Sequence, residues 1–471
     1  MIYTIGSQPA YLAYGNLQSA NNTSDFTVLS TDDAQTDYQY KCDLYVNGSS
    51  TPTVTLSSFP NVPSGGYGEF EISNIVKNLV SYDFAGLYSE ESNIGVHAAP
   101  NSSVSVQLFF GEQYWSGNTF VQVSNATAST IFNYSNASLS FVKSVATPNL
   151  NNFLISPSSA GNFLQSVPPT TINTNTVFLI DSDYAYLVDG DNSFLIDGAF
   201  VGTTQILKTA PKTLRQWLYY YAYPSGSTYP LAHISTYDSN GIQVGHYTLN
   251  NPYSSTASTM QYISVGYPQL LNLPSSAYTV VSGSSTIMTG TVVQYQVYMA
   301  YGTGATASAA SETVLYTIAD ECTRFIGSDV YSIYFLGEYG QFDSIRFAQK
   351  NITTLTKNQT TYKKVQGTLQ TSGIYQRKTY DPSVVPFHTE VTTAIQLNSE
   401  FLTDQQVDNL KYLFSSPAIF IEDRNGVVQA CTVNDTDYVL NRRVNAVNGT
   451  GKAYSLQITV KLSNTSYRQQ L

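Results

Sequence analysis

The chain has 471 residues, of which 13% are aromatic and only 11% are charged, and its formal net charge is −11. This length is too great for a single hydrophobic core, and the acidic balance argues against a nucleic-acid-binding protein, which needs a concentrated basic face. The sequence contains no run of 18 apolar residues, so it predicts no membrane-spanning helix.

The composition favours strands. Tyr occurs 38 times, and Tyr, Thr, Val and Ile suit a pleated, half-buried surface, whereas Ser, Asn and Gly suit turns. Low charge with abundant Tyr has two interpretations. Surfaces that contact other proteins have this composition, and so does a large β protein that is solvated by Ser, Thr and Asn. The sequence leaves both open.

The cysteines and the first residues bear on the compartment. Cys42, Cys322 and Cys431 are widely separated, so they predict buried small side chains in a reducing environment rather than a disulfide framework or a zinc site. The opening "MIYTIGSQPAYLAYGN" lacks the pattern of a signal peptide. We therefore expect synthesis and folding in a cytoplasm, without cofactor or membrane.

Residues 1–145 are predicted to form an N-terminal β-sandwich, because short strand patterns alternate with turns. The stretch "YQYKCDLYVNG" ends at Asn47-Gly48, a favoured tight-turn pair. Ser73 is the expected cap of a short helix. The apolar residues on one face of that helix are Ile75, Val76, Leu79 and Val80.

Residues 146–176 are rich in Asn, Ser, Pro and Thr and have two interpretations. They are either a plain linker or an arm. In the second case the similar tripeptides Asn152-Phe153-Leu154 and Asn162-Phe163-Leu164 would place apolar side chains on a neighbouring surface.

Residues 177–318 are predicted to form a middle β-sandwich, with a hairpin around Ser239-Asn240-Gly241. Residues 319–471 are predicted to form a C-terminal β-rich module with one clear helix near 403–414. The predicted fold class is mainly β: tandem β-sandwich modules, Ig-like or jelly-roll-like, followed by a C-terminal α+β module.

The predicted helix has a complete N-terminal signature. Thr403 is the expected N-cap, Gln406 completes a capping box, and Leu402 staples onto Val407. Its buried stripe is Val407, Leu410 and Leu413. The chain then ends in an alternating strand, "YSLQITVKLS", and a polar tail, "NTSYRQQL".

The acidic stretch 181–197 is the strongest candidate metal site. Clustered carboxylates can bind calcium, but the EF-hand spacing is absent, and Asp-Gly pairs also serve strand turns. The sequence leaves open whether this cluster holds calcium. Its carboxylates are Asp181, Asp183, Asp189, Asp191 and Asp197.

The other candidate chemistry is sparse. His233 and His246 can face each other across the predicted hairpin but lack a third ligand, and His97 and His388 lie elsewhere. The loop 302–308, "GTGATAS", lacks the Lys of a phosphate loop. There is no nucleophile elbow and no His-Glu-x-x-His helix, whereas the paired carboxylates of a glycosidase have no fixed spacing. We therefore predict no catalytic, cofactor-binding or metal site, and no enzyme.

The stretch "VYSIYFLGEYGQFDSIRF", residues 330–347, combines a strand with a turn. Apolar side chains occupy both faces of the strand, so we expect it to be covered on both sides. The turn 337–340 reverses the chain into a second strand. This pattern supplies packing rather than a reacting group.

Several of these segments resemble structural proteins of tailed bacteriophages, particularly phages and prophages of Bacteroidetes, including crAss-like phages. The resemblance rests on "YFLGEYGQFDSIRF", "LTDQQVDNLKYLFSSPAIFIED", "YSLQITVKLSNTSY" and the early "YKCDLYVNGS…GYGEFEIS", so it covers both ends and leaves the middle region uncovered. It implies a virion protein of the tail, collar (neck) or baseplate, with β-sandwich modules assembled in rings. Its implied partners are copies of itself and other virion proteins, and it implies no catalytic residues.

The alternative is a receptor-binding, tail-fibre-type protein that recognises a host surface glycan. Trp115, Trp217 and the run Tyr219-Tyr220-Tyr221 are the side chains that would stack on sugar rings, although the same residues suit hydrophobic cores. The sequence lacks the repeats and coiled-coil heptads that are typical of fibres.

Overall fold

The structure is a computed structural model that confirms a mainly β protein, with 54% strand and 8% helix. It describes residues 4–9, 17–30, 35–62, 65–84, 94–146, 150, 153–155, 161–164, 178–180, 193–195, 205–223, 229–253, 259–304, 307, 309–319, 330–402, 404–434, 444–445, 452–464 and 467–470. None of the described helices is long and apolar enough to cross a membrane.

The chain divides into two compact units. Unit 1 contains Met1–Glu321 and Gly337–Asp343, and unit 2 contains Cys322–Leu336 and Ser344–Leu471. The boundaries placed at 145 and 176 from the sequence fall inside unit 1, whereas the boundary at 318 lies close to the end of its main segment.

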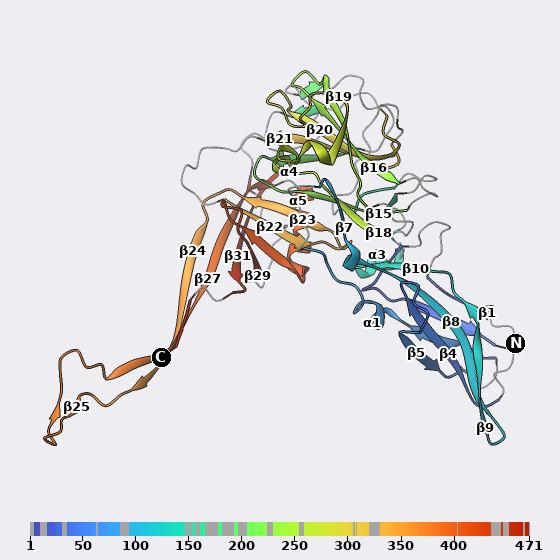
Figure 1. Cartoon of the computed structure of the whole chain (residues 1–471), viewed down its shortest axis with the longest axis horizontal. Coiled ribbons are helices and arrows are strands. Elements are labelled where there is room, and N and C mark those ends of the chain that lie inside the picture. The colour runs from blue at the N-terminus through green and yellow to red at the C-terminus, as the bar shows by residue number, and fades with distance from the viewer. Residues whose placement is uncertain are drawn as a thin grey trace. The chain divides into compact units, whose positions relative to one another are not determined.

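The first part of unit 1 has two sheets, with strand orders β1-β3-β6 and β2-β10-β8-β4-β5, and β9 pairs with β8 (Figure 1). These strands are β1 (Thr4–Ile5), β2 (Leu17–Ser19), β3 (Asp25–Leu29), β4 (Thr36–Val46), β5 (Val54–Ser58), β6 (Gly68–Glu71), β8 (Ser103–Ser116), β9 (Thr119–Ala128) and β10 (Phe132–Ser135). Helices α1 (Ser73–Val76), η1 (Pro100–Ser102) and α3 (Phe141–Ala146) accompany them.

Period-2 alternation places alternate side chains of β3, β4, β8 and β10 in one core. Phe26 contacts Phe132 edge to face, with ring centroids 5.3 Å apart, and both rings are buried. The tight turn predicted at Asn47-Gly48 is confirmed, since both residues have positive φ (50° and 71°) and β4 pairs antiparallel with β5.

The short helix predicted near Ser73 is present, but Ser73 is its first helical residue rather than its cap. The N-cap is Ile72, and it makes no side-chain cap bond. Instead the Glu71 carboxylate accepts a hydrogen bond from the Ser73 backbone N–H at 2.7 Å. The predicted apolar face is confirmed, because Val76 and Val80 are buried and Ile75 and Leu79 pack against the same core.

The second part of unit 1 has a four-stranded sheet, β11-β15-β18-β7, a six-stranded sheet, β14-β21-β20-β16-β17-β19, and a two-stranded pair, β12-β13. Their bounds are β7 (Val96–Ala98), β11 (Leu154–Ile155), β12 (Phe178–Ile180), β13 (Ser193–Leu195), β14 (Gln205–Pro211), β15 (Trp217–Ala222), β16 (Pro230–Tyr237), β17 (Gln243–Leu249), β18 (Thr259–Ser264), β19 (Tyr278–Gly283), β20 (Gln294–Tyr301) and β21 (Thr313–Ala319). Helices α4 (Tyr267–Leu271) and η3 (Ser275–Ala277) complete this part.

Two segments from outside residues 177–318 join these sheets. Strand β7 pairs antiparallel with β18, and β11 pairs parallel with β15. Phe163 and Leu164 are also buried in unit 1. The described apolar residues of segment 146–176, which was predicted to be a linker or an arm, therefore pack within their own unit.

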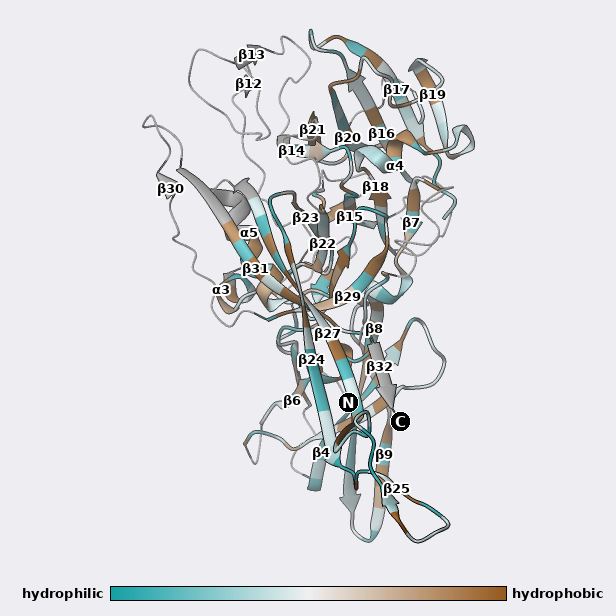
Figure 2. Cartoon of the chain, turned by 90° about the vertical axis from the view of Figure 1, so that its left-hand side faces the viewer, coloured by the Kyte–Doolittle hydropathy of each residue, from teal (hydrophilic) through white to brown (hydrophobic). Residues whose placement is uncertain are grey.

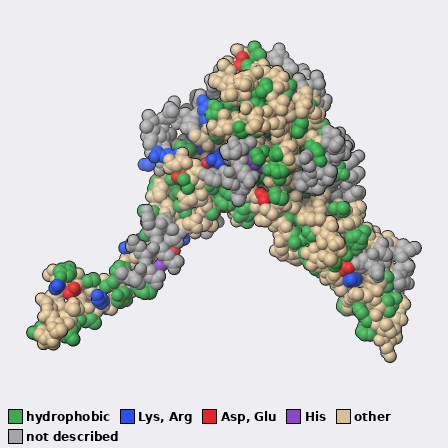
Figure 3. Space-filling view, in the orientation of Figure 1, with side chains coloured by type: hydrophobic (Ala, Val, Ile, Leu, Met, Phe, Trp, Pro, Cys, Tyr) green, Lys and Arg blue, Asp and Glu red, His purple; other side chains and the backbone are tan. Residues whose placement is uncertain are grey.

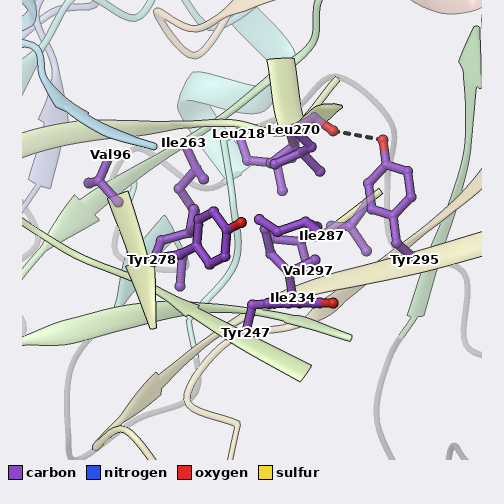
Figure 4. Packing of buried hydrophobic residues seen from close by; sticks show 14 of the residues in the cluster. Val96, Leu218, Ile234, Tyr247, Ile263, Leu270, Tyr278, Ile287, Tyr295 and Val297 are labelled. Atoms are coloured by element: carbon purple, nitrogen blue, oxygen red, sulfur yellow. Dashed lines mark hydrogen bonds between the residues drawn. The ribbon is translucent and has the colours of Figure 1, made fainter. Parts of the chain in front are cut away.

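The core of this second part is rich in Tyr (Figure 4). Val96 from β7 lies in the same cluster as Ile263, Tyr278 and Tyr295. The Tyr295 hydroxyl donates to the Val265 carbonyl at 2.7 Å, so its polar end is satisfied inside the core.

The hairpin predicted around Ser239-Asn240-Gly241 is confirmed. Strands β16 and β17 pair antiparallel, and the Gly241 N–H donates to the Asp238 carbonyl at 3.0 Å. Gly241 has a φ of 73°, a conformation that glycine adopts without strain.

Unit 2 is built on one large sheet with the order β23-β22-β28-β29-β31-β27-β24, to which β30 and β32 attach. The bounds are β22 (Tyr331–Leu336), β23 (Phe342–Phe347), β24 (Ile352–Lys363), β25 (Thr368–Leu369), β26 (Tyr375–Gln376), β27 (Val384–Leu402), β28 (Ile419–Glu422), β29 (Val428–Val433), β30 (Val444–Asn445), β31 (Lys452–Leu462) and β32 (Tyr467–Gln470). The tail expected to be merely polar thus contributes β32, which pairs with β27.

The predicted helix is confirmed as α5 (Asp404–Ser415), and its Leu410 and Leu413 are buried against the sheet core. Thr403, the predicted cap, lies outside the described residues. The strand expected to be covered on both sides, β22, is buried from Ser332 to Leu336.

Candidate functional site

The turn between β22 and β23 is fixed by hydrogen bonds. The Gly337 N–H donates to the Gln341 carbonyl at 2.7 Å, which confirms the predicted reversal. Gly340 has a φ of 84°, and a Cβ there would lie 2.6 Å from the Asn136 carbonyl oxygen. Only glycine fits this close approach.

A residue of this turn, Glu338, forms an ion pair with Lys143 of α3, and the carboxylate partner is buried. The Glu338 carboxylate, whose side chain is 2% exposed, accepts a hydrogen bond from Lys143 Nζ. Lys143 Nζ also donates to the Tyr339 hydroxyl at 3.2 Å and lies 5.2 Å from the centre of its ring. Burial, and then the Glu338 charge, raise the pKa of Tyr339. The sequence analysis missed this pair, because no local pattern links two residues that are 195 positions apart.

A second group of charges surrounds Lys208 on β14. Burial lowers the pKa of Lys208, while Asp343 and Glu312 oppose that shift. Glu312 Oε1 accepts a hydrogen bond from the Phe163 N–H at 2.8 Å. Perturbed groups mark functional sites in some proteins, but here the carboxylate Glu312 holds a backbone segment in place. We assign this group a structural role.

The two histidines expected to face each other do so. His233 Nδ1 lies 3.0 Å from His246 Nε2, and His233 Nε2 lies 2.9 Å from the Gly302 carbonyl. Because a carbonyl only accepts, His233 carries its hydrogen on Nε2, and His246 Nε2 donates to His233 Nδ1. Burial lowers the pKa of both rings, so the pair is neutral near pH 7.

His233 is unsuited to metal binding. Its Nε2–H is donated to the Gly302 carbonyl and the lone pair of its Nδ1 accepts from His246, so His233 has no lone pair available to a cation. No group of three His, Cys, Asp or Glu side chains with metal-binding geometry occurs among the described residues.

The other candidate histidines and cysteines occupy packing positions. His97 is 2% exposed and stacks on Tyr262 with ring centroids 4.8 Å apart, and burial lowers its pKa to about 4. Cys42 and Cys431 are free and buried, and burial raises the pKa of Cys431 to about 12. The third cysteine, Cys322, lies outside the described residues, and so do Asp181, Asp183, Asp189, Asp191 and Asp197.

Most aromatic residues proposed for sugar stacking are buried. Trp217 is 6% exposed, and Tyr219, Tyr220 and Tyr221 are each 1% exposed or less. Trp115, at the end of β8, is instead 42% exposed and lies against Phe120 with ring centroids 5.5 Å apart. This pair is an exposed aromatic surface at a hairpin end.

Among the described residues, ten of the exposed large apolar side chains lie on one ribbon in unit 2. Strand β24 pairs with β27, and the ribbon continues into the small β25-β26 hairpin (Figure 1). Every residue of β24 is exposed, so neither of its faces packs against another layer. The large apolar side chains exposed on the ribbon are Ile352, Leu355, Tyr362, Val365, Leu369, Ile374, Tyr375, Tyr380, Val384 and Phe387.

Comparison with known proteins identifies no family, because no family model and no curated protein matches this chain.

Proposed function

We propose that this chain is a structural virion protein of a tailed phage, built into the tail, collar or baseplate through contacts with copies of itself and with other virion proteins. The proposal starts from the resemblance of the segments at both ends of the chain, such as "YFLGEYGQFDSIRF" and "YSLQITVKLSNTSY". It assigns no catalytic residues, no cofactor and no nucleic-acid contact.

One observation carries the proposal: the uncovered ribbon of unit 2. Beyond the β27 residues that pair with β32, the ribbon has only two described strands, and an isolated two-stranded hairpin is at best marginally stable in water. Monomeric proteins also rarely expose large contiguous apolar surfaces, yet Val365, Leu369 and Ile374 are 73%, 64% and 65% exposed. Such a ribbon suits a subunit whose surface is covered after assembly.

A receptor-binding protein that recognises a host surface glycan is the second candidate. The exposed pair Trp115 and Phe120 favours it, since aromatic faces stack on sugar rings. It ranks second because Trp217 and the tyrosines that follow it are taken up by a core.

The test is to locate the chain and to remove it. Cryo-electron microscopy of purified particles is expected to place it in the tail, collar or baseplate, and particles made without it are expected to lack that part. Complete particles that form without the chain but fail to adsorb to cells would favour the glycan-binding candidate. Absence of the chain from purified particles would overturn both.

A further inference from the structure

The ribbon of unit 2 has a charge opposite to that of the rest of the chain. We define residues 352–390, which contain β24, the β25-β26 hairpin and the first part of β27, as the arm. The arm has five Lys or Arg residues and two acidic residues, a net charge of +3, so the remaining 432 residues carry −14. Its basic residues are Lys357, Lys363, Lys364, Arg377 and Lys378.

The arm combines these charges with apolar contact area. Figure 3 shows hydrophobic side chains along it and Lys or Arg side chains near its tip. Tyr380 is 74% exposed, and Lys378 Nζ lies 5.4 Å from the centre of its ring. Interfaces favour aromatic and apolar centres with charges that are complementary to the partner.

The outer edge of the arm offers a backbone template. In the described sheet β24 is the last strand, and it pairs only with β27. Exposed edges of this kind are commonly protected or used for pairing with another chain. Figure 2 shows that hydrophilic colours prevail on β24, whereas β27 carries hydrophobic segments. The edge of β24 therefore combines polar side chains with backbone groups that no other described strand pairs.

The rest of the chain has an acidic surface that matches the arm. In unit 1 Asp25 pairs with Glu71 across β3 and β6, and Glu69 lies two residues away on β6. All three side chains are exposed. Partial loss of solvent raises the pKa of Asp25, and so, to a smaller extent, do the charges of Glu71 and Glu69. These three like charges lie together on paired strands, where a basic partner would be favoured.

We propose that the arm of one copy docks on the acidic body of a second copy of this chain. This inference rests on the proposed function. It identifies the partner of the arm as the body of another copy, whose excess of charge is opposite to that of the arm. The contact joins two different surfaces, so each copy can both give an arm and receive one. Contacts of this heterologous type close into rings or continue as filaments.

The first test compares the full-length chain with two variants of equal net charge, −17. The arm variant is Lys357→Glu/Lys363→Glu/Lys364→Glu, and the control is Lys77→Glu/Lys411→Glu/Lys461→Glu, whose three side chains are exposed and lie off the arm. Light scattering is measured over a range of concentrations, at about 0.05 M and about 0.5 M salt.

The wild-type mass is expected to rise with concentration above the 51.6 kDa of one chain, and to rise less at high salt. The arm variant is expected to associate at least about tenfold more weakly, and the control to stay within about threefold of the wild type. A wild type that stays monomeric at low salt overturns the proposal, as does an arm variant that assembles like the control. Circular dichroism checks that the variants are folded, which is expected because β24 is exposed throughout.

The second test identifies which surface receives the arm. The arm variant keeps its acidic body, so a labelled arm variant in molar excess is expected to occupy the arms of wild-type chains and to hold them as one-to-one pairs. If the contact joined two arms, the variant would fail to bind, and the acidic body would be the wrong partner. Failure of either test leaves the location of the chain in particles as a separate question, so the two proposals can fail independently.

Discussion

Breaking the ion pair between the partly exposed Lys143 and the buried Glu338 should destabilise unit 1. Removing one partner of a fully buried pair costs about 3–5 kcal/mol, because the other charge stays buried and uncompensated. The Glu338 side chain is 2% exposed, but that of Lys143 is 43% exposed, so solvent screens part of the interaction. We therefore expect Lys143→Met to lower the free energy of unfolding by about 2 kcal/mol.

A double-mutant cycle separates the charge from the packing. Glu338→Gln removes the charge, so the double variant Lys143→Met/Glu338→Gln should be more stable than Lys143→Met alone. Urea unfolding followed by tryptophan fluorescence reports on unit 1, since Trp115 and Trp217 both lie in it. The control Lys77→Met changes an exposed lysine and should stay within about 0.5 kcal/mol of the wild type. A Lys143→Met value as small as the control's, or a double variant that simply adds the two losses, would refute the reasoning.

The remaining predictions concern cores and pH. The pKa of His97 is about 4 in the folded chain and 6.5 in the unfolded chain. Between these pH values the unfolded chain binds more protons, so stability falls as the pH drops from about 6.5 to 4. The full loss of stability is about 3 kcal/mol. The free energy of unfolding, measured at pH 7 and at pH 4.5, should fall less between these two pH values in His97→Gln than in the wild type. Phe163→Ala should lower the free energy of unfolding by about 3–5 kcal/mol, and Phe153→Ala by clearly less, because only Phe163 is fully buried. Trp217→Ala should cost about 3–5 kcal/mol and the exposed Trp115→Ala less than about 1 kcal/mol, both measured by thermal unfolding.

Much of the fold could be predicted from local signals in the sequence. Asn47-Gly48 and Ser239–Gly241 predicted hairpins because few other residues adopt positive φ without strain. Leu410 and Leu413 predicted α5 because their spacing places them on one face. In each case the physical cause acts within a few residues, so a short window of sequence contains it.

The features that sequence reasoning missed depend on contacts between distant residues. Strand β7 has only three residues, and its place beside β18 follows from a core assembled from both parts of unit 1. Lys143 and Glu338 meet only because the turn beyond β22 packs near α3. The exposure of the arm could not be predicted either, because no local pattern in residues 352–390 shows whether another layer covers these strands.

The abundance of Tyr has a specific structural explanation, which changes what this composition indicates about function. Ten of the twelve largest fully buried side chains are Tyr, and several of their hydroxyls form hydrogen bonds inside the core. Tyr40 donates to the Gly66 carbonyl at 2.7 Å, and Tyr220 donates to Gln261 at 2.8 Å. A Tyr-rich composition therefore reflects how these sheets fill their interiors, and it is weak evidence for an interface. The case for assembly instead depends on the arm, where apolar side chains and basic charge are exposed together on strands without a covering layer.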